Sequence, residues 1–79
     1  MPELPGAAAV ARAVSAARNH LSPEDVSKLE NLAKNSGYNA FVVFGIYSDL
    51  EICYKELYNF EKAYLYSTKR MSMLEGFKS

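Results

Sequence analysis

Apolar residues recur at three- and four-residue spacing along most of the chain, which is the period of an amphipathic α-helix. The clearest start signal is Ser22, a typical N-cap, followed by Pro23 at the first helical position and Asp25 in a capping box. One face then carries apolar residues and the other carries charges: Val26, Leu29, Leu32 and Ala33 against Glu24, Lys28, Glu30 and Lys34. We predict a helix here that ends at Gly37, placed as the left-handed residue after the last turn.

The segment before this helix is rich in alanine, the residue with the highest intrinsic helix propensity. It predicts a first helix over residues 6–19, with Pro5 suited to its start and His20 to its end. Val10 and Val14 lie one helical turn apart. The apolar stripe is therefore narrow and built from small side chains, which permits close approach of another helix.

A third helix is expected from about Ala40 to Leu57, behind an Asn39 cap. Its first half is apolar on most sides, which is typical of a helix buried by more than one neighbour. Two stripes follow helical spacing: Ala40, Phe44, Tyr47, Leu50, Tyr54 and Leu57 in one, and Val42, Ile46 and Cys53 in the other. Residues 41–47 also suit a strand, but no second strand is evident to pair with it.

A fourth helix is expected to start near Asn59 or Phe60. Its residues at helical spacing, taken as the face that meets the third helix, are Phe60, Ala63, Tyr64, Met71 and Leu74. Gly76 repeats the helix-ending signal, and Phe77 is placed to fold back on Met71. The tight connection over residues 57–59 makes the last two helices an antiparallel hairpin.

The aromatic residues divide the chain in two. All ten lie from Tyr38 onward, whereas all three prolines and most alanines precede it. We interpret residues 1–79 as a single small all-α domain of four helices, built from an Ala-rich hairpin over 1–37 and an aromatic-rich hairpin over 38–79. Either the first hairpin packs as a lid on the second, or the halves have different origins, natural or engineered.

A known repeat pattern spans the predicted turn between the last two helices: Tyr47, Leu50, Tyr54, Phe60 and Ala63. In its spacing, the segment over about residues 44–76 resembles the tetratricopeptide repeat. Glu51 and Tyr58 stand where that repeat usually has small residues, and no proline closes the unit near Glu75. The resemblance implies a tetratricopeptide-like hairpin and a non-enzymatic interaction module, since members of that family usually bind peptides or helices along a concave surface.

Composition and charge exclude several classes of protein. Apolar residues are 49% and charged residues 23% of the chain, which is typical of a globular protein. Nine Lys and Arg balance nine Asp and Glu, so the electrostatic footprint of a nucleic-acid binder is missing. No apolar run reaches the roughly 18 residues that span a bilayer, and the N-terminus is a poor signal peptide. We expect an intracellular, cytoplasmic protein with no membrane partner.

The residues that carry chemistry are few, so we expect no catalytic residues, no metal site and no cofactor. His20 and Cys53 are the only histidine and cysteine, and they predict a helix-terminal histidine and a buried small apolar residue. We expect Asp49, Glu51 and Glu56 to form a solvated polar face. No HExxH motif, Cys/His cluster or glycine-rich phosphate loop occurs.

The aromatic residues exceed what one small core can hold, unless the Ala-rich hairpin covers them. Surplus tyrosines suit an interface, because each adds apolar area and a hydroxyl group. We predict a partner-binding surface of Tyr38, Phe41, Tyr58 and Tyr66, with Lys69 and Arg70 as rim charges. The hypothesis is a protein–protein interaction or self-assembly module, whose partner is a protein, a peptide or another copy of the chain. The alternative is a designed or recombined helical scaffold with no evolved ligand.

Overall fold

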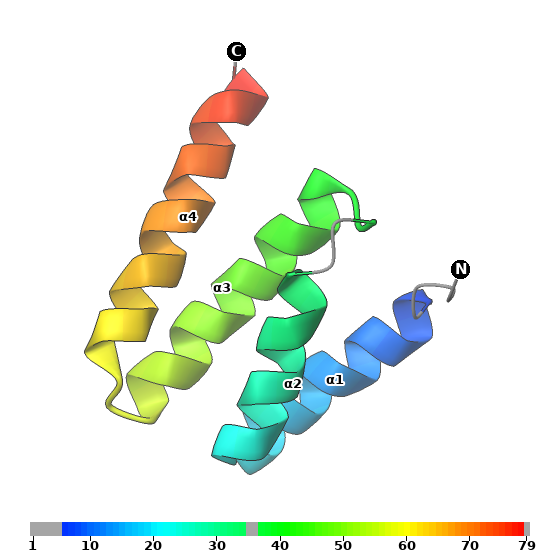
Figure 1. Ribbon diagram of the computed structural model, residues 1–79, viewed down its shortest axis with the longest axis vertical. Helices are drawn as coiled ribbons and strands as arrows, with labels where there is room; N and C mark the ends of the chain where they lie inside the picture. The colour runs from blue at the N-terminus through cyan, green and yellow to red at the C-terminus, as the bar shows by residue number, and fades with distance from the viewer. Residues whose placement is uncertain (1–5, 35–36, 79) are drawn as a thin grey trace.

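The computed structural model describes residues 6–34 and 37–78. This part of the chain is all-α, with four helices (Figure 1): α1 Ala7–His20, α2 Pro23–Ala33, α3 Ala40–Glu56 and α4 Phe60–Lys78. Helix α1 packs against α2, and α3 packs against α4. The prediction of an all-α fold with four helices in two pairs is therefore confirmed.

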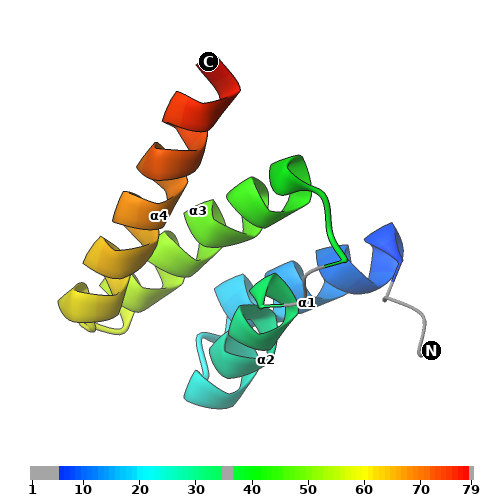
Figure 2. The ribbon, with the colours of Figure 1, turned by 45° about the horizontal axis from the view of Figure 1, so that its top comes forward.

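Helix α3 lies at the centre of the molecule. The α1·α2 pair contacts it on one side and α4 packs on the other, and the backbone of α4 does not come into contact with α1 or α2 (Figures 1 and 2). Both predicted stripes of α3 enter the core, because it has neighbours on two sides. The buried apolar residues are Ala17, Val26, Leu29, Ala33, Ile46, Leu50, Cys53, Tyr54, Ala63 and Tyr66. The Ala-rich pair thus covers α3 and reaches α4 only through side chains.

The starts of three helices follow from capping side chains. Ser22, Asn39 and Asn59 each accept a hydrogen bond from the backbone N–H three residues ahead, at 3.1, 3.0 and 3.2 Å. Each cap pairs one of the N–H groups that a helix leaves without an intrahelical partner at its start. The predicted N-terminal boundaries of α2, α3 and α4 are correct for this reason.

The predicted end of α2 is wrong. The helix ends at Ala33, and the backbone N–H of its C-cap, Lys34, donates to the Leu32 carbonyl instead of continuing the helical pattern. Gly37 therefore lies three residues beyond the cap and is not the residue that follows it.

The predicted end of α4 is wrong as well. The helix continues through Gly76 to Lys78. Its last turn is held by Phe77, whose ring stacks on Phe41 at a centroid distance of 4.9 Å and lies 5.7 Å from Phe44. Phe77 therefore reaches across to α3 instead of folding back along its own helix, and this contact carries the helix past the glycine.

The face of α4 that meets α3 also differs from the prediction. Ala63 and Tyr66 are buried, whereas four residues expected at the core are between 40% and 75% exposed: Phe60, Tyr64, Met71 and Leu74. The cause is that the apolar residues of α4 are spread around the helix, and the backbone of α4 packs against a single helix. Apolar spacing alone cannot then decide which face is covered.

No helix of the described residues has both the length and the apolar character that crossing a bilayer requires.

The turn between α3 and α4 contains a strained position. Tyr58 has a φ of 60°, in the left-handed region that side chains with a Cβ atom disfavour. Its side chain is 81% exposed and contacts the Phe60 ring edge-on. The backbone N–H of Asn59 donates to the Tyr54 carbonyl at 2.8 Å, which fixes the turn.

We predict that Tyr58→Gly is more stable than Tyr58→Ala by about 1 kcal/mol, because glycine adopts positive φ without the steric cost that a Cβ atom brings. The alanine variant is the matched control, since both changes remove the same exposed ring. Denaturant unfolding followed by circular dichroism measures the difference. Equal stabilities would mean that the turn relaxes out of the left-handed conformation.

Candidate protein-interaction surface

The six residues predicted to bind a partner do not form one surface. Tyr38 and Lys69 line the same groove. Phe41 is 74% exposed at the start of α3, and Tyr58 lies in the turn at the opposite end of the α3·α4 pair. The other two residues are held by polar contacts: Tyr66 is buried and Arg70 is half-buried.

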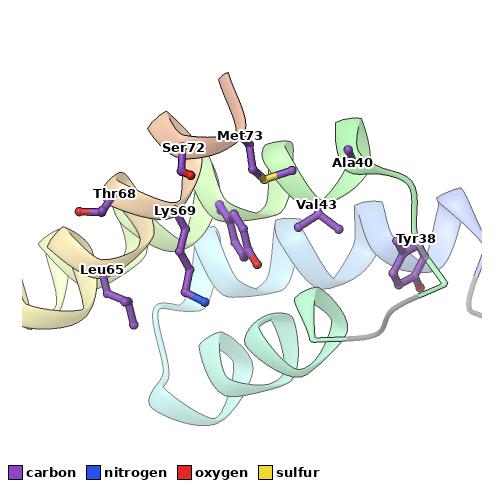
Figure 3. A pocket seen from close by; sticks show the side chains of 9 residues that line it. Tyr38, Ala40, Val43, Leu65, Thr68, Lys69, Ser72 and Met73 are labelled. Atoms are coloured by element: carbon purple, nitrogen blue, oxygen red, sulfur yellow. The ribbon is translucent and has the colours of Figure 1, made fainter. Parts of the chain in front are cut away.

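A groove of about 560 Å³ lies between the first half of α3 and residues 65–73 of α4. Figure 3 shows side chains of the two helices facing one another across it, with Val43 opposite Met73 and Tyr38 at one end. Its lining residues are Tyr38, Ala40, Val43, Tyr47, Leu65, Thr68, Lys69, Ser72 and Met73. Short side chains at Ala40 and Ser72 leave the space that the longer apolar residues enclose.

Lys69 is the only charged residue among those that line this groove. Its Nζ atom lies 5.8 Å from the centre of the Tyr47 ring, within the range of a cation–π contact. Tyr47 in turn packs against Tyr66 with a centroid distance of 5.4 Å. The aromatic ring therefore holds the ammonium group at the apolar wall and leaves its charge available to a ligand.

A buried carboxylate lies where α2 meets side chains of α3 and α4. Glu30 of α2 is 8% exposed and accepts hydrogen bonds from the hydroxyl groups of Tyr54 and Tyr66. The Lys62 Nζ atom lies 3.3 Å from its Oε1 atom and 3.4 Å from its Oε2 atom. Because the donors come from α3 and α4, the Glu30 carboxylate links three helices.

The contacts of Glu30 lower its pKa. Burial alone would raise it, but the hydrogen bonds from Tyr66, Lys62 and Tyr54 stabilise the charged form and outweigh the effect of burial. The pKa of the Tyr66 hydroxyl is raised, first by burial and then by its bond to this carboxylate. Tyr66 therefore stays protonated and remains a donor.

Tyr66 is thus not part of an exposed surface, because it is buried and its hydroxyl binds Glu30. The expectation that Glu30 faces away from the core is also wrong. A signal was present in the sequence, since Glu30 comes four residues after Val26 and three before Ala33. This spacing places it on the buried face of α2.

Arg70 is held against α3 by a second polar cluster. Its Nη2 atom lies 2.7 Å from Glu51 Oε1, and Lys55 lies 3.2 Å from Glu51 Oε2. Burial would raise the pKa of Glu51, but the hydrogen bonds from both cations lower it. Arg70 therefore ties α4 to α3 and is not a free rim charge.

The expected solvated face of carboxylates on α3 is wrong at two of its three positions. Glu51 binds Arg70, and Asp49 lies 3.5 Å from Arg18 of α1. Burial raises the pKa of Asp49, and Arg18 opposes this only in part. Glu56 alone is exposed as expected.

His20, Ser22 and Asp25 lie together but are not arranged as a nucleophilic triad. The Asp25 Oδ2 atom lies 2.9 Å from the Ser22 hydroxyl and 3.3 Å from His20 Nδ1. A triad places the histidine between serine and aspartate, whereas here the aspartate lies between the other two. These contacts lie at the α1–α2 turn, where the Ser22 hydroxyl oxygen also accepts from the Asp25 backbone N–H and so caps α2.

The remaining reactive side chain, Cys53, is fully buried, and burial raises the pKa of its thiol. Over residues 6–34 and 37–78, no three His, Cys, Asp or Glu side chains form a group that could hold a metal ion. The groove and the exposed residues of α4 are the uncovered apolar surfaces of the α3·α4 pair.

Comparisons of the chain with protein-family models, curated proteins and solved structures find no match. The tetratricopeptide resemblance of residues 44–76 therefore stays a prediction. Any function has to be argued from the surfaces themselves.

We predict that Glu30→Gln lowers the free energy of unfolding by about 1–3 kcal/mol, the usual range for hydrogen bonds to a buried charged group. The amide keeps the size of the side chain but loses the charge that pairs with Lys62. Glu56→Gln, at an exposed position of α3, is the control and is expected to change stability little. Chemical denaturation measures both; equal effects would contradict the assigned role of Glu30.

The contribution of Glu30 to the free energy of unfolding is also expected to depend on pH. Because the pKa of Glu30 is lowered in the folded state, its stabilising contribution is complete above its ordinary value of 4.5 and is lost as pH falls through the lowered value. The stability difference between wild type and Glu30→Gln is expected to be constant near neutral pH and to shrink in acid. Unfolding midpoints across a pH series measure it, and a difference that stays constant into acid would oppose this expectation.

Proposed function

We propose that the protein is a non-enzymatic interaction module that binds an apolar segment of a partner protein in the groove between α3 and α4. The observation that carries this proposal is the composition of the groove, whose walls are mainly aromatic and aliphatic with a single cation, Lys69. Apolar concave surfaces with a few polar groups are the usual form of binding sites in proteins.

The chemistry of the groove favours one kind of partner segment. Its apolar residues would pack against Val43 and Met73, and an acidic side chain beside them would pair with Lys69. Such a pair fixes the orientation of the segment more than it adds affinity, because the lysine is exposed.

The walls of the groove are held in place before binding. Helix α3 is fixed from both sides, and α4 is tied to its neighbours through the Glu30 and Glu51 clusters. A wall that does not have to be ordered on binding costs less conformational entropy. The residues of both polar clusters lie outside the groove lining. One of them, Tyr66, packs against the ring of Tyr47, which does line the groove.

The test is selection of a displayed library of random peptides on the wild-type protein, with counter-selection on Val43→Asp. We expect enriched peptides to combine apolar residues with an aspartate or glutamate, and Lys69→Gln to weaken them up to about fivefold. Lys28→Gln, at an exposed position of α2, is the matched control and is expected to leave binding unchanged.

Circular dichroism of each variant verifies that the helices are retained. Peptides that bind Val43→Asp as tightly as the wild type would refute the groove as the site. Failure to enrich any peptide would count against the function itself and favour the scaffold hypothesis.

A further inference from the structure

Outside the groove lining, α4 carries a regular row of residues that are exposed except for the half-buried Ser67. They follow alternating spacings of four and three: Phe60, Tyr64, Ser67, Met71, Leu74 and Lys78. We call this row the outer stripe. The large apolar members are Phe60, Tyr64, Met71 and Leu74, each at least 40% exposed. A seven-residue repeat of this kind is the seam of a two-helix coiled coil.

The outer stripe is distinct from the other two faces of α4. Ala63 and Tyr66 are buried in the core, and Leu65, Lys69 and Met73 line the groove. None of these residues belongs to the outer stripe. Helix α4 therefore has one covered face and two uncovered ones, and the groove accounts for only one of the two.

The charges at the ends of α4 indicate what covers the outer stripe. Glu61 lies in the first turn and Lys78 in the last. Both are exposed, and neither takes part in an ion pair within the described residues. An antiparallel copy of the same helix would bring Glu61 of each chain beside Lys78 of the other chain. A parallel copy would place Glu61 beside Glu61 and Lys78 beside Lys78.

We propose that the protein forms a two-fold symmetric dimer in which the outer stripes of two α4 helices pack antiparallel. The symmetry makes the contact self-complementary, so one stripe supplies both sides. The helix dipoles also oppose each other in this arrangement, which favours it over the parallel one.

The side-chain sizes fit one antiparallel register. With Phe60 opposite Lys78 of the second copy, Tyr64 lies opposite Leu74 and the small Ser67 lies opposite the long Met71. Each contact occurs twice by symmetry. Small residues facing large ones allow two helix surfaces to interdigitate. Helix α4 has 19 residues and is about 28 Å long, so the seam extends over several turns.

The test is sedimentation velocity of the full chain over a wide range of concentration. We expect the wild type to show a reversible monomer–dimer equilibrium. Met71→Asp places a charge in the seam and is expected to leave only monomer. Leu65→Asp is the matched control, because it makes the same kind of change on the groove side of α4 and leaves the outer stripe intact.

Charge reversal tests the antiparallel orientation. Glu61→Lys or Lys78→Glu alone should weaken the dimer about threefold to tenfold, because each places like charges together twice. The variant with both changes restores opposite charges and should dimerise as the wild type does. A parallel dimer would show no such restoration.

A wild type that stays monomeric at all concentrations would overturn the proposal. Equal dimerisation of Met71→Asp and wild type, or no recovery in the double charge variant, would overturn it as well. Circular dichroism verifies that each variant keeps its helices. Failure here is separable from failure of the proposed function, because Met71 is not among the residues that line the peptide groove.

Discussion

The arrangement of the helices depends on the hydrogen bonds and the ion pair that the Glu30 carboxylate makes with side chains of α3 and α4. The backbone of α4 makes no contact with α2, yet Lys62 and Tyr66 of α4 reach this one group. A buried carboxylate is costly unless donors surround it, and here the donors come from both helices of the second pair. The two halves of the chain are thereby joined by a buried polar contact, in addition to the shared apolar core and the Arg18–Asp49 ion pair.

The second constraint is that α4 has a single helical neighbour. A helix that is apolar on most of its circumference is normally buried by several others. Here only the face with Ala63 and Tyr66 is buried, and within the described residues α3 is the one helix whose backbone packs against α4. The Ala-rich pair does cover the aromatic half, but only on α3. The groove and the outer stripe are both exposed because α4 packs against only one other helix.

The sequence predicts the helices well because their signals are local. Ser22, Asn39 and Asn59 each act through hydrogen bonds that span three residues, so their effect is independent of the tertiary fold. The face of α4 and the burial of Glu30 depend instead on which helices become neighbours. Gly76 fails as an end signal for a similar reason, since the contact of Phe77 with Phe41 is made across 36 residues. Local sequence patterns do not determine which helices pack against one another. They therefore do not determine the candidate surfaces either.

The two uncovered faces of α4 have a joint consequence. A dimer built on the outer stripes leaves the groove of each copy open, because none of the residues that line it belongs to the seam. Two grooves related by two-fold symmetry would then belong to one particle. A partner with two apolar segments would bind both, and the second contact would form at a high effective concentration without any new interaction. A module this small gains affinity more readily from such pairing than from a larger groove, since one lysine and short walls limit what each groove can supply.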